Sequence, residues 1–378
     1  MHPPIEIKSV DNQVDRMLFV QFPFELYVHH PFWVPPQIEE EMAYFDPTQN
    51  FVFKNAEACC FLAFQNNKVV GRIAAMVNHI EVNALKTKKL RFGWFDFIDD
   101  INVSQKLLEA AEAWGKARKL DHMEGPMGFS NLDKAGMLTM GFEERSTMIT
   151  LYNHPYYAKH LTQLGYDSKT EWVEYEIKVP KREDMPENVK RFANLVVNRY
   201  QLKTLHFNSR KSIYPYVEQM FQLLDQTYSA LSTYIPIQND QIEHYKKKYF
   251  PYVNPDYIKC IVNQKGELVA FSIILPCFTK ALQKMKGKKN LSSYYHLFKA
   301  LYFNDRASFY LIGIRPDYQN KGLTALIFYE MLDVFKKYNI KWVETNPELK
   351  DNLAIQQLWK HYQKRLHKKR ATFGKKIG

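Results

Sequence analysis

The sequence predicts an α/β fold made of two tandem domains, each a mixed β-sheet flanked by helices. Three observations favour this fold class: the length of the chain, its apolar content and a repeated order of strands and helices. At 378 residues, 46% of them hydrophobic, the chain is too long for one ordinary core and has enough apolar material for two. No low-complexity tract argues for disorder, so we expect a chain that is folded throughout.

The first half of the chain sets out the repeated order. Two apolar runs on either side of a polar turn are typical of a β-hairpin, and apolar residues three or four apart are typical of a helix. On these patterns the first half is predicted to contain a hairpin at 58–77, a strand at 91–98, a helix at 104–120, a strand at 122–129, a short helix at 153–166 and a strand at 170–179.

The second half repeats that order about 200 residues later. Its predicted elements are a hairpin at 257–276, a strand at 308–314, a helix at 325–338, a strand at 341–346, a helix at 352–362 and a strand at 370–376. A linker is expected at 179–189, where prolines and charges gather, so we place the two domains at 1–180 and 181–378. The second half also has an insertion, residues 279–305, between its hairpin and its next strand.

Charge and cysteine content limit the function. A net charge of +12 favours anionic partners in general, with basic clusters at 279–290 and 367–378. The four cysteines have no metal-ligand spacing, so we expect neither a metal nor a disulfide.

No apolar run is long enough for a membrane span and no signal core is present, which favours a cytoplasmic location. No helix-turn-helix, zinc or RNP pattern is present, so no specific nucleic-acid partner is expected.

The stretch RPDYQNKGLT at 315–324 carries the clearest chemical signal. It joins a predicted strand to a predicted helix, and the free backbone N–H groups at the start of a helix bind anions. Gly322 lets a phosphate approach the main chain, and no acid occurs from Tyr318 to Tyr329. The stretch fits neither the Walker P-loop nor the dinucleotide fingerprint. The pattern therefore indicates a diphosphate site of another kind.

This stretch resembles the Q/R-x-x-G-x-G/A loop of the GNAT superfamily of acyl-CoA N-acyltransferases. The order of predicted elements around it is also that of the superfamily. Phrases such as VVGRIAA, GPMGFSNLDKAGMLTMGFE and YNHPYY make the whole chain similar to bacterial tandem-GNAT proteins with a degenerate first half. The resemblance implies acetyl-CoA or a longer acyl-CoA as co-substrate, bound by the backbone and side chains of Ile312, Ile314, Gln319, Asn320, Lys321, Gly322, Leu323, Thr324 and Asn352.

Two departures from the superfamily pattern concern the loop and the catalytic acid. Thr324 stands where Gly or Ala is usual, and Trp359 stands where a tyrosine general acid is often found. Because indole cannot protonate a thiolate, we assign the acid role to Tyr362, three residues on and on roughly the same helix face. Glu344, near the end of a predicted strand, is the candidate general base. The alternatives are a packed aromatic at 362 and a surface acid at 344.

The first half departs further from the superfamily loop. Asp96, Asp99 and Asp100 occupy the corresponding stretch, which has no glycine, so acyl-CoA is not expected to bind there. This half is predicted to act as a scaffold or as the acceptor side of the site. Its candidate acceptor-side residues are Asn131, Asp133, Tyr152 and Asn153; the alternative is that they cap turns and helices.

The substrate remains open between three interpretations. The resemblance implies transfer of an acyl group, with acetyl favoured, from acyl-CoA to a primary amine by direct attack. A second interpretation is a long-chain N-acyltransferase that acts on a lipid amine at a membrane surface. A third, of a different class, is a non-catalytic protein that binds CoA or a polyanion.

The insertion bears on this choice. It holds Lys280, Lys284, Lys286, Lys288, Lys289 and Lys299 and a single acid, Asp305. It is expected to form either a lid over a small amine or a peripheral contact with an anionic membrane. The lid is favoured at this point, because Gly287 and the pair Ser292–Ser293 are expected to interrupt any long amphipathic helix.

Overall fold

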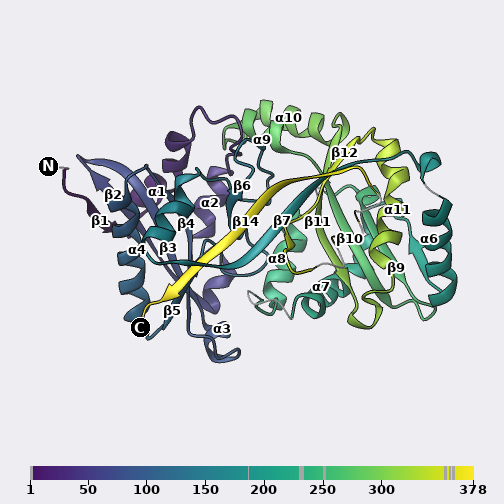
Figure 1. Ribbon diagram of the computed structural model, residues 1–378, viewed down its shortest axis with the longest axis horizontal. Helices are drawn as coiled ribbons and strands as arrows, with labels where there is room; N and C mark the ends of the chain where they lie inside the picture. The colour runs from purple at the N-terminus through teal and green to yellow at the C-terminus, as the bar shows by residue number, and fades with distance from the viewer. Residues whose placement is uncertain are drawn as a thin grey trace. The chain divides into compact units, whose positions relative to one another are not determined.

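The computed structural model describes residues 3–185, 187–229, 234–249, 253–352, 356, 359 and 362–378. The chain divides into two compact units. Unit 1 comprises residues 1–172, 278–297 and 368–378, and unit 2 comprises residues 173–277 and 298–367. The divisions fall inside two long strands, β7 (Asp167–Lys178) and β14 (Lys364–Lys376), and inside helix α10 (Leu291–Tyr302) (Figure 1).

Unit 1 contains a mixed sheet. Its strands are β1 (Glu6–Ser9), β2 (Ala56–Gln65), β3 (Lys68–Asn78), β4 (Lys89–Phe97), β5 (His122–Gly125), β6 (Met137–Met140) and the end of β14. Strands β1 to β4 pair antiparallel in chain order, β4 pairs parallel with β5, and β5 pairs antiparallel with β14. The parallel pair needs a crossover helix, because a hairpin cannot join parallel strands.

Helices cover the sheet of unit 1. They are α1 (Gln13–Leu26), α2 (Ile38–Tyr44), α3 (His79–Asn83), α4 (Ile101–Lys116), α5 (Tyr156–Gln163) and α9 (Thr279–Met285), with a 3₁₀ turn at Phe51–Lys54. The crossover helix α4 packs on β2, β3 and β4 through Val103, Leu107 and Ala111, which recur at helical spacing. Helix α1 contributes Phe19 and Val20 to a separate core.

Unit 2 repeats this pairing. Its strands are β8 (Lys203–Leu205), β9 (Ile258–Val262), β10 (Leu268–Pro276), β11 (Arg306–Ile314), β12 (Trp342–Glu344), β13 (Glu348–Leu349) and the adjoining parts of β7 and β14. Strands β8 to β11 pair antiparallel, β11 pairs parallel with β12, and β12 pairs antiparallel with β7. Each unit therefore has a mixed sheet with one parallel crossover, which confirms the predicted fold class.

The helices of unit 2 lie in two layers. They are α6 (Glu187–Tyr200), α7 (Tyr214–Tyr228), α8 (Asn239–Tyr249) and α11 (Leu323–Lys337), with 3₁₀ turns at Arg182–Asp184, Lys211–Ile213, Pro255–Tyr257 and Pro316–Tyr318. Helices α6 and α11 share one core with Val343 and Ala307, whereas α7 packs through Leu223 and Leu224 in another with Phe271. The predicted helix at 352–362 lies mostly outside the described residues.

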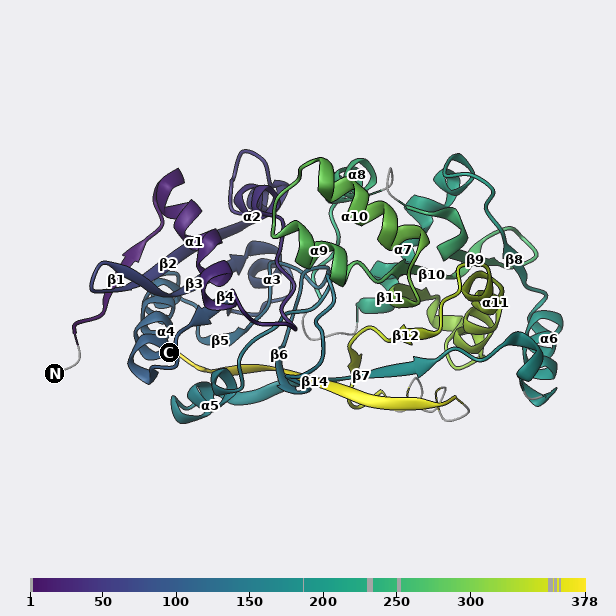
Figure 2. The ribbon, with the colours of Figure 1, turned by 90° about the horizontal axis from the view of Figure 1, so that it is seen from above.

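The insertion at 279–305 forms two helices, α9 and α10, which follow one another along the chain (Figure 2). Lys286 and Gly287 separate them with positive φ angles of 48° and 74°. The expected break at Ser292–Ser293 is wrong, because both serines lie in the first turn of α10, which continues to Tyr302. Within the described residues, none of the helices combines the length and hydropathy needed to cross a lipid bilayer.

Acidic residues of the first half have structural partners in unit 1. The carboxylate of Asp96 accepts hydrogen bonds from Arg72 Nε at 2.8 Å and Tyr27 Oη at 3.0 Å. The carboxylate of Asp100 caps α4 by accepting a hydrogen bond from the backbone N–H of Asn102. A protein carboxylate thus lies at the helix start where a phosphate would otherwise bind.

We predict that Arg72→Met lowers the free energy of unfolding by about 3–5 kcal/mol, because it leaves the buried Asp96 carboxylate without its cation. The control is Lys106→Met, which breaks only the exposed pair with Glu109 and is expected to cost about 1 kcal/mol or less. Urea denaturation measures both. A loss below 1 kcal/mol for Arg72→Met would mean that the Asp96 pair is not needed for folding.

Candidate functional site

The loop between β11 and α11 has a backbone that requires glycine. Asn320 and Gly322 have φ angles of 59° and 83°, and Gly322 is the N-cap of α11, with no side chain capping the helix. A Cβ atom at Gly322 would lie 2.5 Å from Cζ of Phe192 on α6. Conformation and packing therefore both exclude a larger residue, and the first-turn N–H groups of α11 are not capped by the N-cap side chain.

The charge of this loop is positive. Lys321 Nζ lies 5.0 Å from the ring centroids of both Tyr200 and Tyr318. The nearby carboxylate of Asp317 accepts a hydrogen bond from Arg315 Nε at 2.7 Å, and this contact lowers the pKa of Asp317. Because Arg315 neutralises that carboxylate, Lys321 sets the charge next to Gly322. The donors and the charge suit a diphosphate.

Strands β11 and β12 separate after three paired residues. Their register ends at the pair Ser308–Glu344. The next backbone N–H, that of Thr345, donates to the carbonyl of Tyr175 on β7 at 2.9 Å, whereas β11 continues to Ile314. Because the strands are parallel, the end of β12 and the loop before α11 lie towards the same end of the strand pair.

The backbone of β11 beyond the separation is contacted by side chains. The carbonyl of Ile312 accepts from Tyr228 Oη at 3.3 Å, and the N–H of Ile314 donates to Thr227 Oγ1 at 3.2 Å. Both hydroxyls come from the end of α7. A pantetheine arm that pairs with Ile312 and Ile314 would have to replace these bonds, so the predicted role of these two residues stays a prediction.

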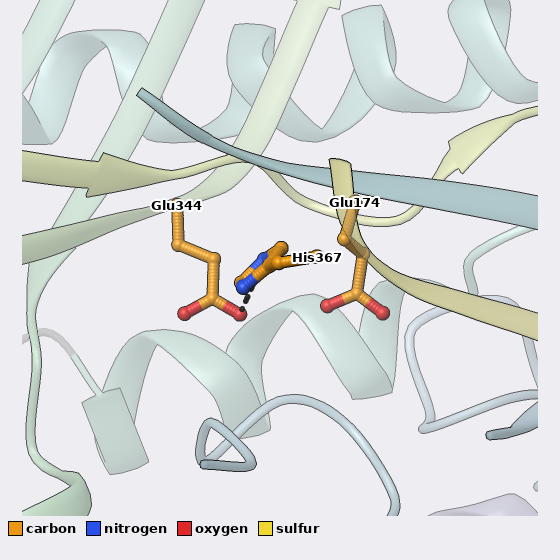
Figure 3. A group of neighbouring side chains, drawn as sticks. All are labelled: Glu174, Glu344 and His367. Carbon is orange, nitrogen blue, oxygen red and sulfur yellow. Dashed lines mark ion pairs between the residues drawn. The ribbon is translucent and has the colours of Figure 1, made fainter. Parts of the chain in front are cut away.

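Glu344, the predicted base, lies in a group with Glu174 of β7 and His367 of β14. One ligand atom from each of the three side chains lies within 4.8 Å of the others. His367 Nε2 is 3.4 Å from Glu344 Oε1, and the exposed fractions of these two side chains are 3% and 15%. Figure 3 shows the imidazole between the two carboxylates. The sequence indicated Glu344 but not its two partners.

A third carboxylate, Glu176, faces Glu344 across the β7–β12 pair. Arg306 and Arg365 both bind it, the latter at 3.0 Å. Burial alone would raise the pKa of Glu176, but the two guanidinium groups outweigh burial and the pKa lies below its ordinary value. Glu176 is thus neutralised as an ion pair, whereas the Glu344 group contains a histidine as its basic member.

Tyr362, the predicted acid, packs on the other face of the sheet from Glu344. Its ring centroid is 4.6 Å from that of Phe328, and it lies against the core that contains Val343. Side chains alternate along a strand, so Glu344 points away from the face where Val343 is buried. Burial raises the pKa of Tyr362 to about 12, which keeps its hydroxyl protonated at neutral pH.

Trp359 is a buried core residue whose indole N–H binds a buried carboxyl group. Its Nε1 donates to Oε1 of Glu348 at 2.8 Å inside the protein. Burial raises the pKa of Glu348 to about 7, although this hydrogen bond lowers it, and Oε2 of Glu348 has no partner among the described residues. The sequence offered no signal for this buried carboxyl group, because nothing in its spacing distinguishes it from an exposed acid.

Asn352 is exposed and follows β13. Its backbone N–H donates to the carbonyl of Leu349 at 3.0 Å, and its own carbonyl accepts from Gln356 at 3.4 Å. Most of the helix that it was predicted to open lies outside the described residues, so its contact with a CoA arm stays a prediction.

The four acceptor-side candidates all lie in unit 1. Asn153 bonds the backbone N–H and carbonyl of Leu138, Asp133 accepts from the backbone N–H of Ser130, and Tyr152 Oη donates to the carbonyl of Phe142. Asn131 is half-buried in the same loop as Asp133. These contacts order the local backbone, as the structural alternative for these residues expects. No contact among the described residues tests whether they also bind the acceptor, so that role stays a prediction.

Glu124 is the position in unit 1 that corresponds to Glu344. Each ends the register of the parallel strand pair, Glu124 opposite Arg91 and Glu344 opposite Ser308. The Glu124 carboxylate is buried and pairs with Lys89 Nζ at 3.1 Å. The equivalent acid of unit 1 is therefore held as a buried ion pair, which supports a structural role for the first half.

Comparisons with known proteins agree with this architecture. No protein-family profile matches the chain. The chain is 22% identical to "Protein YghO" of Escherichia coli over 98% of its own length and 95% of the relative, and 23% identical to "Bacterial ceramide synthase" of Caulobacter vibrioides over 90% of each. A tandem GNAT protein from the clavulanic acid biosynthesis pathway superposes with a TM-score of 0.55 at 10% identity, covering 99% of both chains.

We predict that Glu348→Gln removes a pH-dependent loss of stability. With a folded-state pKa of about 7 against an ordinary value of 4.5, the native protein retains a proton that the unfolded chain releases between these pH values. The native stability therefore falls as pH rises through this window, and the variant should be more stable by about 1 kcal/mol at pH 5 and about 3 kcal/mol at pH 8.

Urea denaturation at the two pH values measures the difference. The control is Glu243→Gln, whose carboxylate is exposed beside Lys246 and should leave the pH dependence unchanged. The same pH dependence in Glu348→Gln and the native protein would contradict the raised pKa.

Proposed function

From the tandem GNAT fold of this chain, we propose that it is an N-acyltransferase that moves an acyl group from acyl-CoA to a primary amine. The observation that carries the proposal is the separation of β11 from β12 at Glu344, with His367 and Glu174 beside it. Among the described residues, no strand pairs with this edge of β11 between the carboxylate at one end and the cationic loop at the other. Side chains bond its backbone instead, Asn346 at Tyr310, Tyr228 at Ile312 and Thr227 at Ile314.

Acyl-CoA fits this arrangement in length and in charge. Six residues of β11, 309–314, extend beyond the last paired residue, and at ~3.3 Å per residue they span about 20 Å. An extended pantetheine arm that replaces the side-chain hydrogen bonds of this edge would have its diphosphate at Lys321 and the N-terminus of α11. The thioester would then lie near Glu344, where the strands separate.

The chemistry is direct attack of the amine on the thioester. Glu344 accepts a proton from the ammonium group of the acceptor, and the free amine attacks the thioester carbon. The C–S bond breaks, the leaving thiolate takes a proton from the hydroxyl of Tyr362, and the nitrogen of the new amide gives up its second proton, which restores the tyrosine hydroxyl through solvent. Glu344 and Tyr362 lie on opposite faces of the sheet, so the proposal requires the thioester to lie between β11 and β12, within reach of both side chains.

His367 acts on this reaction through Glu344. Its Nε2 contact and its burial fix the orientation of the carboxylate, so we treat it as a positioning residue. Glu174 lies on the far side of the imidazole (Figure 3). The carboxyl groups of Glu174 and Glu344 therefore flank the place where the ammonium group of the acceptor would bind, whereas Glu176 is already neutralised by Arg306 and Arg365.

For the acceptor, we propose a lipid amine acylated from a long-chain acyl-CoA, in preference to acetyl transfer to a small amine. The support is the 23% identity, over 90% of the chain, to a protein named bacterial ceramide synthase, since a ceramide is an N-acylated lipid amine. The test is turnover with acetyl-CoA and palmitoyl-CoA against a short alkylamine, a lysine peptide and a long-chain amino alcohol. Turnover with only the short amine or the peptide would overturn the lipid assignment.

We predict that one CoA binds per chain, at the loop before α11, and that Lys321→Glu weakens it at least 10-fold by placing a negative charge beside the diphosphate. This substitution tests charge without the clash that any Cβ at Gly322 would make with Phe192. Calorimetry with CoA measures both the affinity and the stoichiometry.

The matched control for this variant is Lys336→Glu, the same charge change at the other end of α11. At 1.5 Å per residue the two lysines lie ~22 Å apart, more than two screening lengths at physiological salt, so the control should keep its affinity within twofold. Two sites per chain, or equal losses in the two variants, would contradict the assignment of the loop.

We predict that Glu344→Gln lowers turnover by roughly 10² to 10⁴-fold, because the amide cannot accept the ammonium proton. The loss should shrink as pH rises towards the pKa of the acceptor amine, since more of the amine is then free without a base. Steady-state kinetics between pH 7 and pH 9.5 give the ratio of native to variant turnover at each pH, and calorimetry measures the CoA affinity separately.

The control for the base is Glu348→Gln, which removes a nearby buried carboxyl group that has no role in the proposed step. Native-like turnover in Glu344→Gln, or a loss that is constant over the pH range, would exclude Glu344 as the base. If the native protein and the Glu348→Gln control turned over none of the amines while CoA still bound at the loop, the interpretation as a non-catalytic CoA-binding protein would replace the interpretation as an enzyme.

A further inference from the structure

Helix α9 and the turn that precedes α10 are held within unit 1 by hydrogen bonds and an ion pair. Thr279 Oγ1 donates to the carbonyl of Ser146 at 2.9 Å, and the carbonyl of Gly287 accepts from the backbone N–H of Ile38 at 3.0 Å. Lys289 Nζ is 3.0 Å from a carboxylate oxygen of Glu40. The start of the segment is therefore ordered by hydrogen bonds and an ion pair.

The apolar residues of α10 face outward. Leu291, Tyr294, Tyr295, Phe298 and Tyr302 recur at helical spacing, and all five are exposed, Leu291 to 90% and Phe298 to 55%. Phe303, the next residue after the helix, is 73% exposed. We call these six residues the aromatic face.

The opposite side of α10 is the buried one. Ser293 and Ala300, which lie roughly opposite Leu291 on a helical projection, are the most buried residues of the helix. Surface helices of globular proteins normally bury their apolar stripe and expose their small and polar residues. Helix α10 follows this rule only in part: Leu297 and Leu301, on the same side as Ser293 and Ala300, are half-buried, whereas the aromatic face stays exposed. The described residues of the chain do not cover the aromatic face, which therefore favours a partner outside the chain.

The charge around the aromatic face is positive. Lys280, Lys284, Lys286, Lys288 and Lys299 are exposed in the same segment, and no acid occurs from 279 to 304. Interfaces between proteins are depleted of lysine, whereas aromatic rings flanked by lysines are typical of helices that lie in the headgroup region of a bilayer. Charge complementarity therefore favours an anionic lipid surface over a protein partner.

We propose that α10 docks the protein on an anionic membrane, with the aromatic face among the headgroups and the lysines against lipid phosphates. The rings supply apolar area, and the tyrosine hydroxyls remain in contact with water. The docking reverses the expectation of a lid over a small amine. It concerns a surface distinct from the acyl-CoA site and needs neither Glu344 nor the loop at 319–324.

The test is cosedimentation of the intact chain with vesicles of phosphatidylglycerol and phosphatidylethanolamine, without acyl-CoA or amine. We expect binding at 50 mM salt that weakens at least 10-fold at 500 mM salt, and at least 10-fold weaker binding to vesicles of phosphatidylcholine alone. Absence of binding to the anionic vesicles at low salt, or binding that ignores salt and lipid charge, would overturn the proposal.

Two variants separate the aromatic face from the charge. The triple substitution Leu291→Ser, Tyr295→Ser and Phe298→Ser should weaken vesicle binding at least 10-fold. Its control is the triple substitution Val14→Ser, Val28→Ser and Phe51→Ser, which removes exposed apolar residues outside the segment and should stay within twofold. Lys284→Gln, Lys288→Gln and Lys299→Gln together should weaken binding and flatten its salt dependence.

Circular dichroism and gel filtration accompany each variant. A serine variant that is folded, monomeric and binds as the native protein does would overturn the proposal. A native dimer that the serine substitutions convert to a monomer would assign the aromatic face to a second copy of the chain and would equally overturn it. Because the vesicle assay contains neither acyl-CoA nor amine, failure of the docking proposal would not decide the acyltransferase proposal, which has its own tests.

Discussion

The parallel pairing of β11 with β12 is the constraint on which the candidate site depends. Parallel neighbours require a crossover, here α11, and the crossover brings the start of α11 and the end of β12 to the same end of the pair. Because β12 ends at Glu344, β11 runs on without a β12 partner as far as the loop. The short strand thereby leaves an edge of β11 that side chains, and no described strand, bond, with a carboxylate where the two strands separate.

The same pairing occurs in unit 1 with different residues, and the difference has a physical cause. There the acid at the end of the parallel pair, Glu124, binds Lys89, and Asp100 caps the crossover helix. A buried ion pair and a self-capped helix need no ligand to complete them. Unit 1 thus satisfies internally the two groups that correspond to Glu344 and to the start of α11 in unit 2, which supports the proposal of one acyl-CoA site per chain.

The sequence was sufficient for the fold and for proposing one loop and one carboxylate of the candidate site. Hairpins, crossover helices and the glycine loop are local patterns, and Glu344 could be proposed because it lies near the end of a predicted strand. Glu174 and His367 could not, because β7 and β14 bring them to Glu344 from distant parts of the sequence. The orientation of α10 was missed for another reason: its spacing predicts an apolar face, but spacing does not say whether that face is buried.

The two ends of the β11 edge in unit 2 carry different groups. Lys321 and the N-terminus of α11 attract anions, whereas the other end carries the carboxyl groups of Glu174 and Glu344 beside a histidine. The neighbouring Glu176 adds no free negative charge, because two arginines neutralise it. Six residues of β11 lie between the two ends, so a diphosphate at the loop would be kept away from the carboxyl groups. This separation is what the proposed transfer from acyl-CoA to an amine needs, because the diphosphate and the ammonium group carry opposite charges.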